Sequence, residues 1–221
     1  MSWGAMFVDS DGVPWATPDS TPMSLIEKRI FNREGAGVDI IKLNYDKPVI
    51  IGVHSNNNKV IGAITRNTND GATAIQSRMI TGDGPYNLTV YIFSTQLQPT
   101  VPFGINIFNA SGQCIQTNET KVMPAPVRLG SPGSDESGYN VRTTLSGRWA
   151  VIPATTGYVT AVIQTGGGGR PFQQPITSFA SFDGANTQIY SGAWDTPGGA
   201  ATNITYANTR DSVYVIDVSG F

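Results

Sequence analysis

Short runs of β-favouring residues, separated by Gly, Pro, Asn and Ser, recur along the 221-residue chain, and no helix-length periodic pattern interrupts them. The clearest run is Tyr86 to Ser94, in which Leu88, Val90 and Ile92 alternate with one hydroxyl and two aromatic side chains. Because large apolar groups occur in both sets, we expect a strand covered on both faces, as in the centre of a sandwich. The sequence therefore predicts an all-β fold, an antiparallel β-sandwich built from hairpins and meanders.

The stretch from Phe103 to Met123 has the pattern of a β-hairpin. Ile105 to Phe108 favours a strand, Asn109 to Gly112 supplies turn residues, and Cys114 to Thr117 favours a return strand. Since glycine adopts a positive φ without a steric penalty, we expect Gly112 to have one.

The beginning of the chain repeats this hairpin pattern one hundred positions earlier, with GAMFVDSDGVPWATPDSTPM against GINIFNASGQCIQTNETKVM. Gly4 matches Gly104, and Gly12 matches Gly112, so Gly12 is also expected to have a positive φ. Two hairpins of one design would then open two halves of the chain. The alternative is that unrelated hairpins share turn residues.

The region from Ser24 to Ile80 is also expected to be strand-rich. Ser24 to Phe31 fits a strand better than a short helix, because no helical pattern continues it. Three runs between Val38 and Ile64 follow one another closely and predict an antiparallel meander, and Ala72 to Ile80 predicts one more strand.

The segment Gly130 to Gly138 is the best candidate for a linker or long loop, because it contains three glycines, a proline and three serines. It would divide the chain into an N-terminal lobe, 1–129, and a C-terminal lobe, 139–221, although both could belong to one domain. The last segment, Ser212 to Phe221, is an apolar β-favouring run that needs a partner on each edge, either within the sandwich or from another subunit.

Charge and cysteine content exclude several classes of protein. Charged residues make up 14% of the chain, against an average of about 25%, and the net charge of −2 comes with no Lys/Arg cluster, so nucleic-acid binding is not expected. The N-terminus lacks the pattern of a secretory signal, and no run of eighteen apolar residues occurs, so a soluble cytoplasmic product without membrane insertion is expected. The single cysteine, Cys114, is expected to be a small core residue and not a reactive thiol.

Candidate binding motifs have simpler structural explanations. His54 has no partner ligands nearby in the sequence and is expected at a strand end. The tract Gly166 to Gly169 is followed by Arg170 and Pro171, without the Lys-Ser/Thr and helix of a phosphate loop, so a flexible loop is expected. No catalytic, cofactor-binding or metal residues are therefore assigned.

Paired carboxylates are the remaining route to hydrolysis, particularly of glycans. The candidates are Asp135, Glu136, Asp183, Asp195, Asp211 and Asp217. Most lie beside Gly, Ser or Asn in predicted turns, where aspartate commonly has a structural role, so we predict that the protein is not an enzyme. Trp194, expected to be exposed in a loop, fits sugar stacking better than acid/base chemistry.

The opening, WGAMFVDSDGVPWATPDSTPMSLI, resembles the N-termini of a family of small tail-tip or tail-fibre-associated proteins of siphophages. YNLTVYIFS followed by FGINIFNASGQCIQTNETKVM is similar to a strand and Asn-Ala-Ser-Gly pattern recurrent in such proteins. These structural motifs cover under a third of the chain.

This resemblance implies a virion component of the distal tail, made in the bacterial cytoplasm and assembled with other tail proteins. It implies a host surface glycan or an outer-membrane receptor as a further partner, and a homotrimer as the oligomer, with a single copy docked on another tail protein as the alternative. A glycan-binding module and a glycan-cleaving enzyme are the alternatives.

Overall fold

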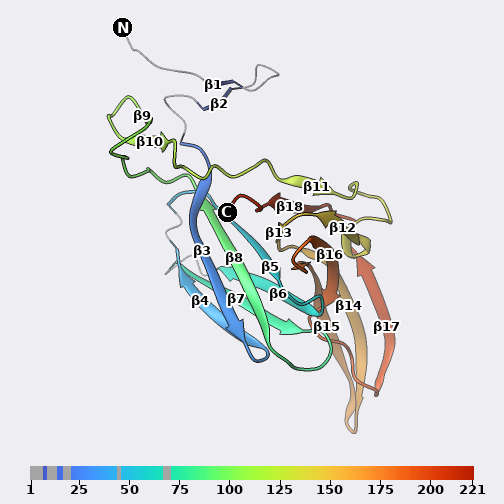
Figure 1. Ribbon diagram of the computed structural model, residues 1–221. Helices are drawn as coiled ribbons and strands as arrows, with labels where there is room; N and C mark the ends of the chain where they lie inside the picture. Colours follow the sequence, from blue (N-terminus) through green and yellow to red (C-terminus); the bar gives the residue numbers. More distant parts are fainter. Residues whose placement is uncertain (1–6, 9–13, 17–20, 44–45, 67–70) are drawn as a thin grey trace. The chain divides into compact units, whose positions relative to one another are not determined.

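The computed structural model describes residues 7–8, 14–16, 21–43, 46–66 and 71–221, which form strands, connecting loops and one short 3-10 helix (Figure 1). In chain order these elements are β1 (Phe7–Val8), β2 (Pro14–Ala16), β3 (Ser24–Arg33), β4 (Gly37–Lys42), β5 (Val49–Ser55), β6 (Val60–Arg66), β7 (Ala72–Met79), β8 (Tyr86–Ser94), β9 (Asn106–Phe108), β10 (Cys114–Thr117), β11 (Val127–Leu129), η1 (Gly138–Asn140), β12 (Thr143–Ser146), β13 (Trp149–Ile152), β14 (Thr155–Thr165), β15 (Gly168–Phe182), β16 (Asn186–Ala193), β17 (Ala201–Asn208) and β18 (Val213–Asp217). The predicted all-β class is confirmed.

Two compact units share these strands. The first unit contains Met1–Lys28, Asn44–Ile50 and Tyr91–Pro124, and the second contains Arg29–Leu43, Ile51–Val90 and Ala125–Phe221. Strands β3, β5 and β8 each contribute residues to both units. The segment Gly130 to Gly138 lies inside the second unit and is a long loop that leads into η1.

The hairpin of the first unit agrees with the sequence prediction. β9 and β10 pair antiparallel, with Cys114 opposite Phe108. The turn is held by Asn109, whose Oδ1 accepts hydrogen bonds from the backbone N–H groups of Ser111 (3.0 Å) and Gln113 (2.9 Å). Gly112 has φ +74°, as expected, and Cys114 is buried. The matching Gly12 lies outside the described residues.

Gly112→Ala is expected to lower the free energy of unfolding by about 1 kcal/mol, because an L side chain is strained at positive φ. No atom lies within 4 Å of a Cβ built at this position, so the penalty arises from the backbone alone. Urea unfolding measures the difference. The matched control is Gly198→Ala, where the space is also open and φ is outside the left-handed region. Equal stabilities of the two variants would contradict this explanation.

An eleven-stranded sheet contains most of the strands of the second unit, in the order β11-β18-β13-β5-β15-β14-β17. Off this path, β16 joins β12 to β15, and β8 joins β3 to β5. β18 lies between β11 and β13 and pairs antiparallel with both. The predicted need of the last strand for two partners is therefore confirmed, and both partners come from the same chain.

The meander predicted between Val38 and Ile64 is wrong. The three runs do form β4, β5 and β6, but β7 lies between β4 and β6 in a separate three-stranded sheet. β5 instead pairs with β13 and, in parallel, with β15. The physical reason is burial: β5 is nearly all buried, whereas β4 exposes every second residue and fits a sheet with one solvent face.

The core of the second unit contains β15, β16 and the first part of β8, Tyr86 to Val90. β8 is buried at every residue except Asn87, as predicted for a strand covered on both faces. Phe179 on β15 lies edge-on to Tyr190 on β16, with ring centroids 6.5 Å apart. The Tyr190 hydroxyl donates a hydrogen bond to the Val60 carbonyl oxygen, and burial raises the pKa of this phenol.

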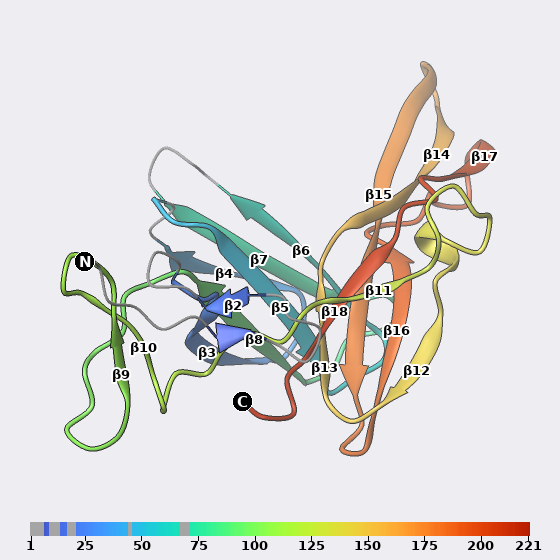
Figure 2. The ribbon, with the colours of Figure 1, turned by 90° about the horizontal axis from the view of Figure 1, so that it is seen from above.

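β14 and β15 form a long antiparallel hairpin that β17 flanks on the outer side of β14 (Figures 1 and 2). The Gly166 to Gly169 tract, predicted as a flexible loop, is instead the tight tip of this hairpin, because β15 already begins at Gly168. The ladder closes with Thr165 opposite Gly168.

Candidate functional site

A row of polar side chains crosses four neighbouring strands of the large sheet. Thr144 on β12 lies opposite Gln188 on β16, Gln188 lies opposite Ser181 on β15, and Ser181 lies opposite Ser55 on β5. Residues that are directly opposite in neighbouring strands share a face of the sheet, so these four side chains form one continuous polar row.

The turn between β5 and β6, Asn56 to Asn58, covers this face of the sheet. Tyr190 lies two residues after Gln188 and therefore on the same face, and its hydroxyl donates to the carbonyl oxygen of Asn57 at 3.5 Å. Asn58 Nδ2 donates to Gln188 Oε1 at 3.5 Å, so the turn contacts the row directly. The three asparagines thus form a wall beside a floor of hydroxyl and amide groups.

Two adjoining cavities lie between this wall and the neighbouring strands, and we call them together the Asn-turn groove. One, of about 310 Å³, is lined by Asn58, Arg142, Thr143, Thr144, Gln188, Ile189 and Tyr190. The other, of about 330 Å³, is lined by Asn56, Asn57, Asn58, Ser181, Phe182, Asp183 and Gln188. Asn58 and Gln188 line both cavities, which makes the groove continuous.

The amides of the wall are oriented by the backbone. Asn56 Oδ1 accepts from the Asn87 N–H at 2.7 Å, and Asn57 Oδ1 accepts from the Lys59 N–H at 2.9 Å. With their oxygens held in this way, both side chains present NH₂ donors for a ligand. Arg142 adds a guanidinium to the lining of the first cavity.

Asp183 supplies an ionised acceptor at one end of the groove. Its Oδ1 accepts from the backbone N–H groups of Asn186 (2.7 Å) and Ala185 (2.8 Å), which close the turn between β15 and β16. These two bonds, with that to Asn186 the stronger, lower the pKa of the carboxyl group below its usual 3.8. The other carboxylate oxygen can accept from a ligand.

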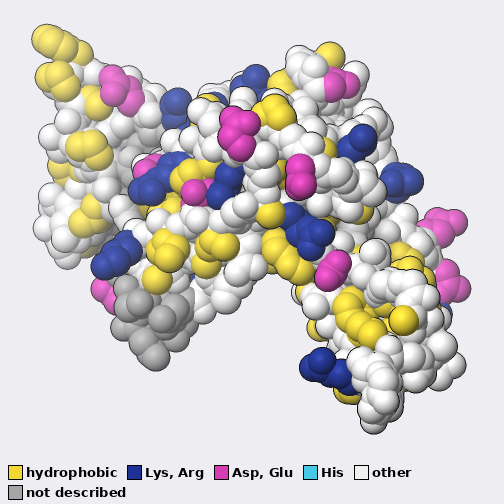
Figure 3. Space-filling model, turned by 90° about the horizontal axis from the view of Figure 1, so that it is seen from below, with side chains coloured by type: hydrophobic (Ala, Val, Ile, Leu, Met, Phe, Trp, Pro, Cys, Tyr) yellow, Lys and Arg dark blue, Asp and Glu magenta, His cyan; other side chains and the backbone are white. Residues whose placement is uncertain are grey.

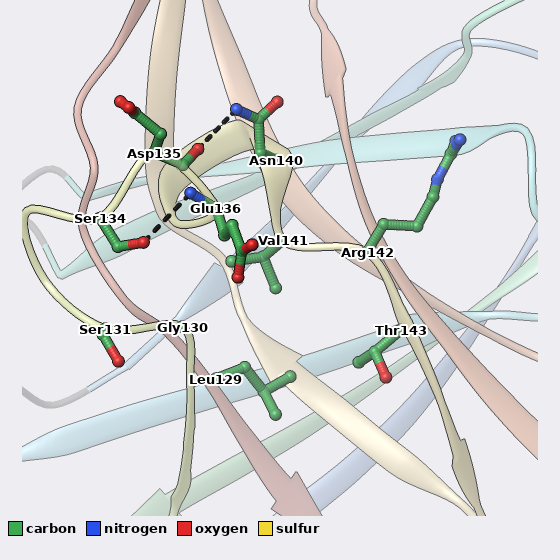
Figure 4. A pocket seen from close by; sticks show the side chains of 10 residues that line it. All are labelled: Leu129, Gly130, Ser131, Ser134, Asp135, Glu136, Asn140, Val141, Arg142 and Thr143. Carbon is green, nitrogen blue, oxygen red and sulfur yellow. Dashed lines mark hydrogen bonds between the residues drawn. The ribbon is translucent and has the colours of Figure 1, made fainter.

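A second cleft, of about 680 Å³, lies beside the loop before η1 and shares Arg142 and Thr143 with the groove (Figure 4). Asp135 and Glu136 line it, but their carboxylates point in different directions (Figure 4). Asp135 is paired with Arg210 at 2.6 Å. The geometry is therefore not that of two carboxylates aimed at one bond.

The remaining predicted carboxylates do not join these two. Asp183 lines the far part of the groove, Asp195 lies 3.9 Å from Arg78, and Asp217 accepts from the Ser219 N–H at 2.9 Å in a turn. Asp211 lines neither the groove nor the second cleft. The structural role predicted for turn aspartates is shown directly for Asp183 and Asp217.

Sequence reasoning identified Asp183 but missed the rest of the groove. The triple asparagine, Asn56 to Asn58, is by itself typical only of a turn, and Gln188 and Thr144 carry no local motif. Trp194, predicted to be exposed, is half-buried, and its backbone N–H donates to the Pro175 carbonyl oxygen. His54 lies next to the end of β5, as predicted, and its ring is edge-on to Phe182.

Among residues 21–43, 46–66 and 71–221, together with the short β1 and β2 strands, no cluster of His, Cys, Asp and Glu is arranged to hold a metal ion. No helix in that part of the chain is long and apolar enough to cross a bilayer. On the face seen in Figure 3, Lys and Arg side chains are scattered among acidic ones and do not form a basic patch.

Comparison with known proteins gives no further identification: no protein family, no curated protein and no solved structure matches this chain.

Proposed function

We propose that this chain is a structural component of the distal tail of a bacteriophage virion, at the tail tip or tail fibre, where it contributes to assembly and host attachment. The similarity of its opening and of the β8 to β10 region to siphophage tail proteins supports this role. It is made in the bacterial cytoplasm, and its partners are other tail proteins. A turn-rich all-β fold suits such an assembly module.

Host attachment uses the Asn-turn groove, with a surface glycan as the ligand. The observation that carries this proposal is the continuous set of amide and hydroxyl groups on the wall and floor of the groove. Sugar hydroxyls donate and accept hydrogen bonds, and the Asn and Gln amides do the same. The lining contains few apolar side chains, so the groove lacks the pockets that bind peptide side chains.

The glycan is bound and not cleaved. General acid and base catalysis of glycoside hydrolysis requires two carboxyl groups on either side of one bond. Asp183 is the acid that lines the groove, and its pKa is lowered, whereas a general acid needs a raised pKa. Release of reducing ends from a bound polysaccharide would contradict this part of the proposal.

Asp183→Asn is expected to weaken glycan binding roughly tenfold, because the carboxylate oxygen available to the ligand is replaced by an NH₂ group that cannot accept a hydrogen bond. The asparagine retains Oδ1 for the turn, so the fold is preserved. Binding is measured on an array of bacterial surface polysaccharides and then by titration calorimetry with the best ligand. Asp195→Asn, an exposed aspartate outside the groove, is the matched control and should change affinity less than twofold.

Gln188→Ala should also weaken glycan binding, because Gln188 lines both halves of the groove. If no polysaccharide binds, or if Asp183→Asn and Asp195→Asn behave alike, glycan recognition by the groove is excluded. Antibody labelling of purified particles tests the tail location separately. Absence of the chain from particles would exclude the virion role even if the groove binds a glycan.

Glycan binding should be independent of pH between roughly 5 and 8, because the lowered pKa keeps Asp183 ionised throughout this range. The stability contributed by its two backbone bonds is present above the unfolded-state pKa. That stability is lost as the pH falls through the lower folded-state pKa. Binding titrations at several pH values check this expectation. If glycan affinity changed with a midpoint near neutral pH, the group that binds the ligand would be a residue other than Asp183.

A further inference from the structure

β17 is an open edge of the large sheet with an unusual composition. It pairs with β14 alone, and the six residues Thr202 to Ala207 are all exposed. The side chains of Ile204 and Tyr206 are 48% and 54% exposed. No charged residue and no proline occurs in this strand.

The other described edges of the two larger sheets are protected in the usual ways. β3, β4 and β6 contain charged residues, and β11 and β12 have three and four residues. Natural proteins use short length, charge, proline or bulges to prevent pairing between sheet edges. β17 has eight residues and only one such feature, a bulge at Asn203, which has φ 53°.

The bulge and the neighbouring loop leave a short regular segment open. Asn203 and Ile204 together face one residue of β14, since Thr160 is opposite Thr205 and Val162 is opposite Thr202. At the other end, Asn208 Nδ2 donates to the carbonyl oxygen of Ser137 at 2.9 Å. The regular segment that remains open therefore runs from Ile204 to Ala207.

We propose that Ile204 to Tyr206 of this segment pair antiparallel with the same residues of a second copy of the chain, across a twofold axis at Thr205. In this register Ile204 lies opposite Tyr206 of the second copy, and Tyr206 lies opposite Ile204, so all four exposed apolar side chains form cross-strand pairs. In a register centred on Ile204 or on Tyr206, two of these four apolar side chains would lie opposite polar residues. Because the strand is uncharged, two copies approach without electrostatic repulsion.

Because a twofold interface uses the same strand of both copies, the assembly is limited to a dimer. This differs from the threefold arrangement implied by the resemblance. The interface is short, so dimerisation should be weak and dependent on concentration. The surface is separate from the Asn-turn groove: none of its residues lines either groove cavity. Failure of this proposal therefore leaves the proposed function untouched.

Site-specific cross-linking tests the register. Thr205→Cys places two thiols directly opposite each other, at a distance suitable for a disulfide. Under mild oxidation this variant should form a covalent dimer. Thr202→Cys, also exposed and on the same strand, would face Asn208 of the second copy and should remain a monomer on a non-reducing gel. The natural Cys114 is buried, so the unmodified chain is the background control.

Sedimentation equilibrium tests the association itself. The average mass of the unmodified chain should rise with concentration from 23.5 kDa towards twice that value. Tyr206→Lys should weaken association at least tenfold, while Tyr214→Lys, an exposed position on β18, which is paired on both sides, should not. A mass that stays at one chain, a threefold mass, or equal cross-linking of the two cysteine variants would overturn the proposal.

Discussion

Truncation after Arg210 is expected to leave the second unit unable to fold. The deletion removes β18 from its place between β11 and β13 in the large sheet. Val213, Val215, Ile216 and Val218 have no exposed surface, and full burial of each contributes about 1.5–3 kcal/mol. The sum approaches the whole free energy of unfolding of a typical domain, which is about 5–15 kcal/mol.

The measurement is the soluble fraction after expression, followed by circular dichroism of any soluble chain. Two point variants in the same strand show whether the loss of stability comes from the buried side chains of β18. Val215→Ala should destabilise clearly, whereas Tyr214→Ala, at a position 44% exposed, should have a small effect. A truncated chain that stays soluble and retains its β-sheet spectrum would show that β18 is dispensable.

Phe179→Ala is expected to lower the free energy of unfolding by about 3–5 kcal/mol. The ring is 1% exposed, packs against Tyr190, and fills the space above Gly62, where a Cβ would lie 2.6 Å from Phe179 Cε2. Removal of the ring therefore leaves a cavity that the backbone of β6 cannot fill without moving.

Urea unfolding measures this loss, and Phe103→Ala is the matched control, because Phe103 is 88% exposed and its removal should change stability by less than about 0.5 kcal/mol. Gly62→Ala adds a second check. Its destabilisation should be partly relieved when combined with Phe179→Ala, although a contact of 2.9 Å with the Gln76 carbonyl oxygen remains. A small effect of Phe179→Ala would mean that the core is not centred on this residue.

The Asn-turn groove could be predicted only in part. The triple asparagine and Asp183 are each typical of turns, and both do occupy turns. That the two turns lie beside each other depends on the pairing of β5 with β15, strands more than one hundred residues apart in the chain. No local pattern encodes such a pairing, so the groove could not be assembled from the sequence.

The sequence by itself determined the all-β class, most strand positions, the hairpin turn at Gly112 and the burial of β8, because these follow from side-chain alternation and turn chemistry within a few residues. Only the tertiary structure decided which strands pair. β7 lies between β4 and β6, and β18 lies between β11 and β13, because burial and hydrogen bonding are optimised over the whole sheet and not between neighbours in the chain. The same long-range pairing creates the groove and leaves β17 as an open edge.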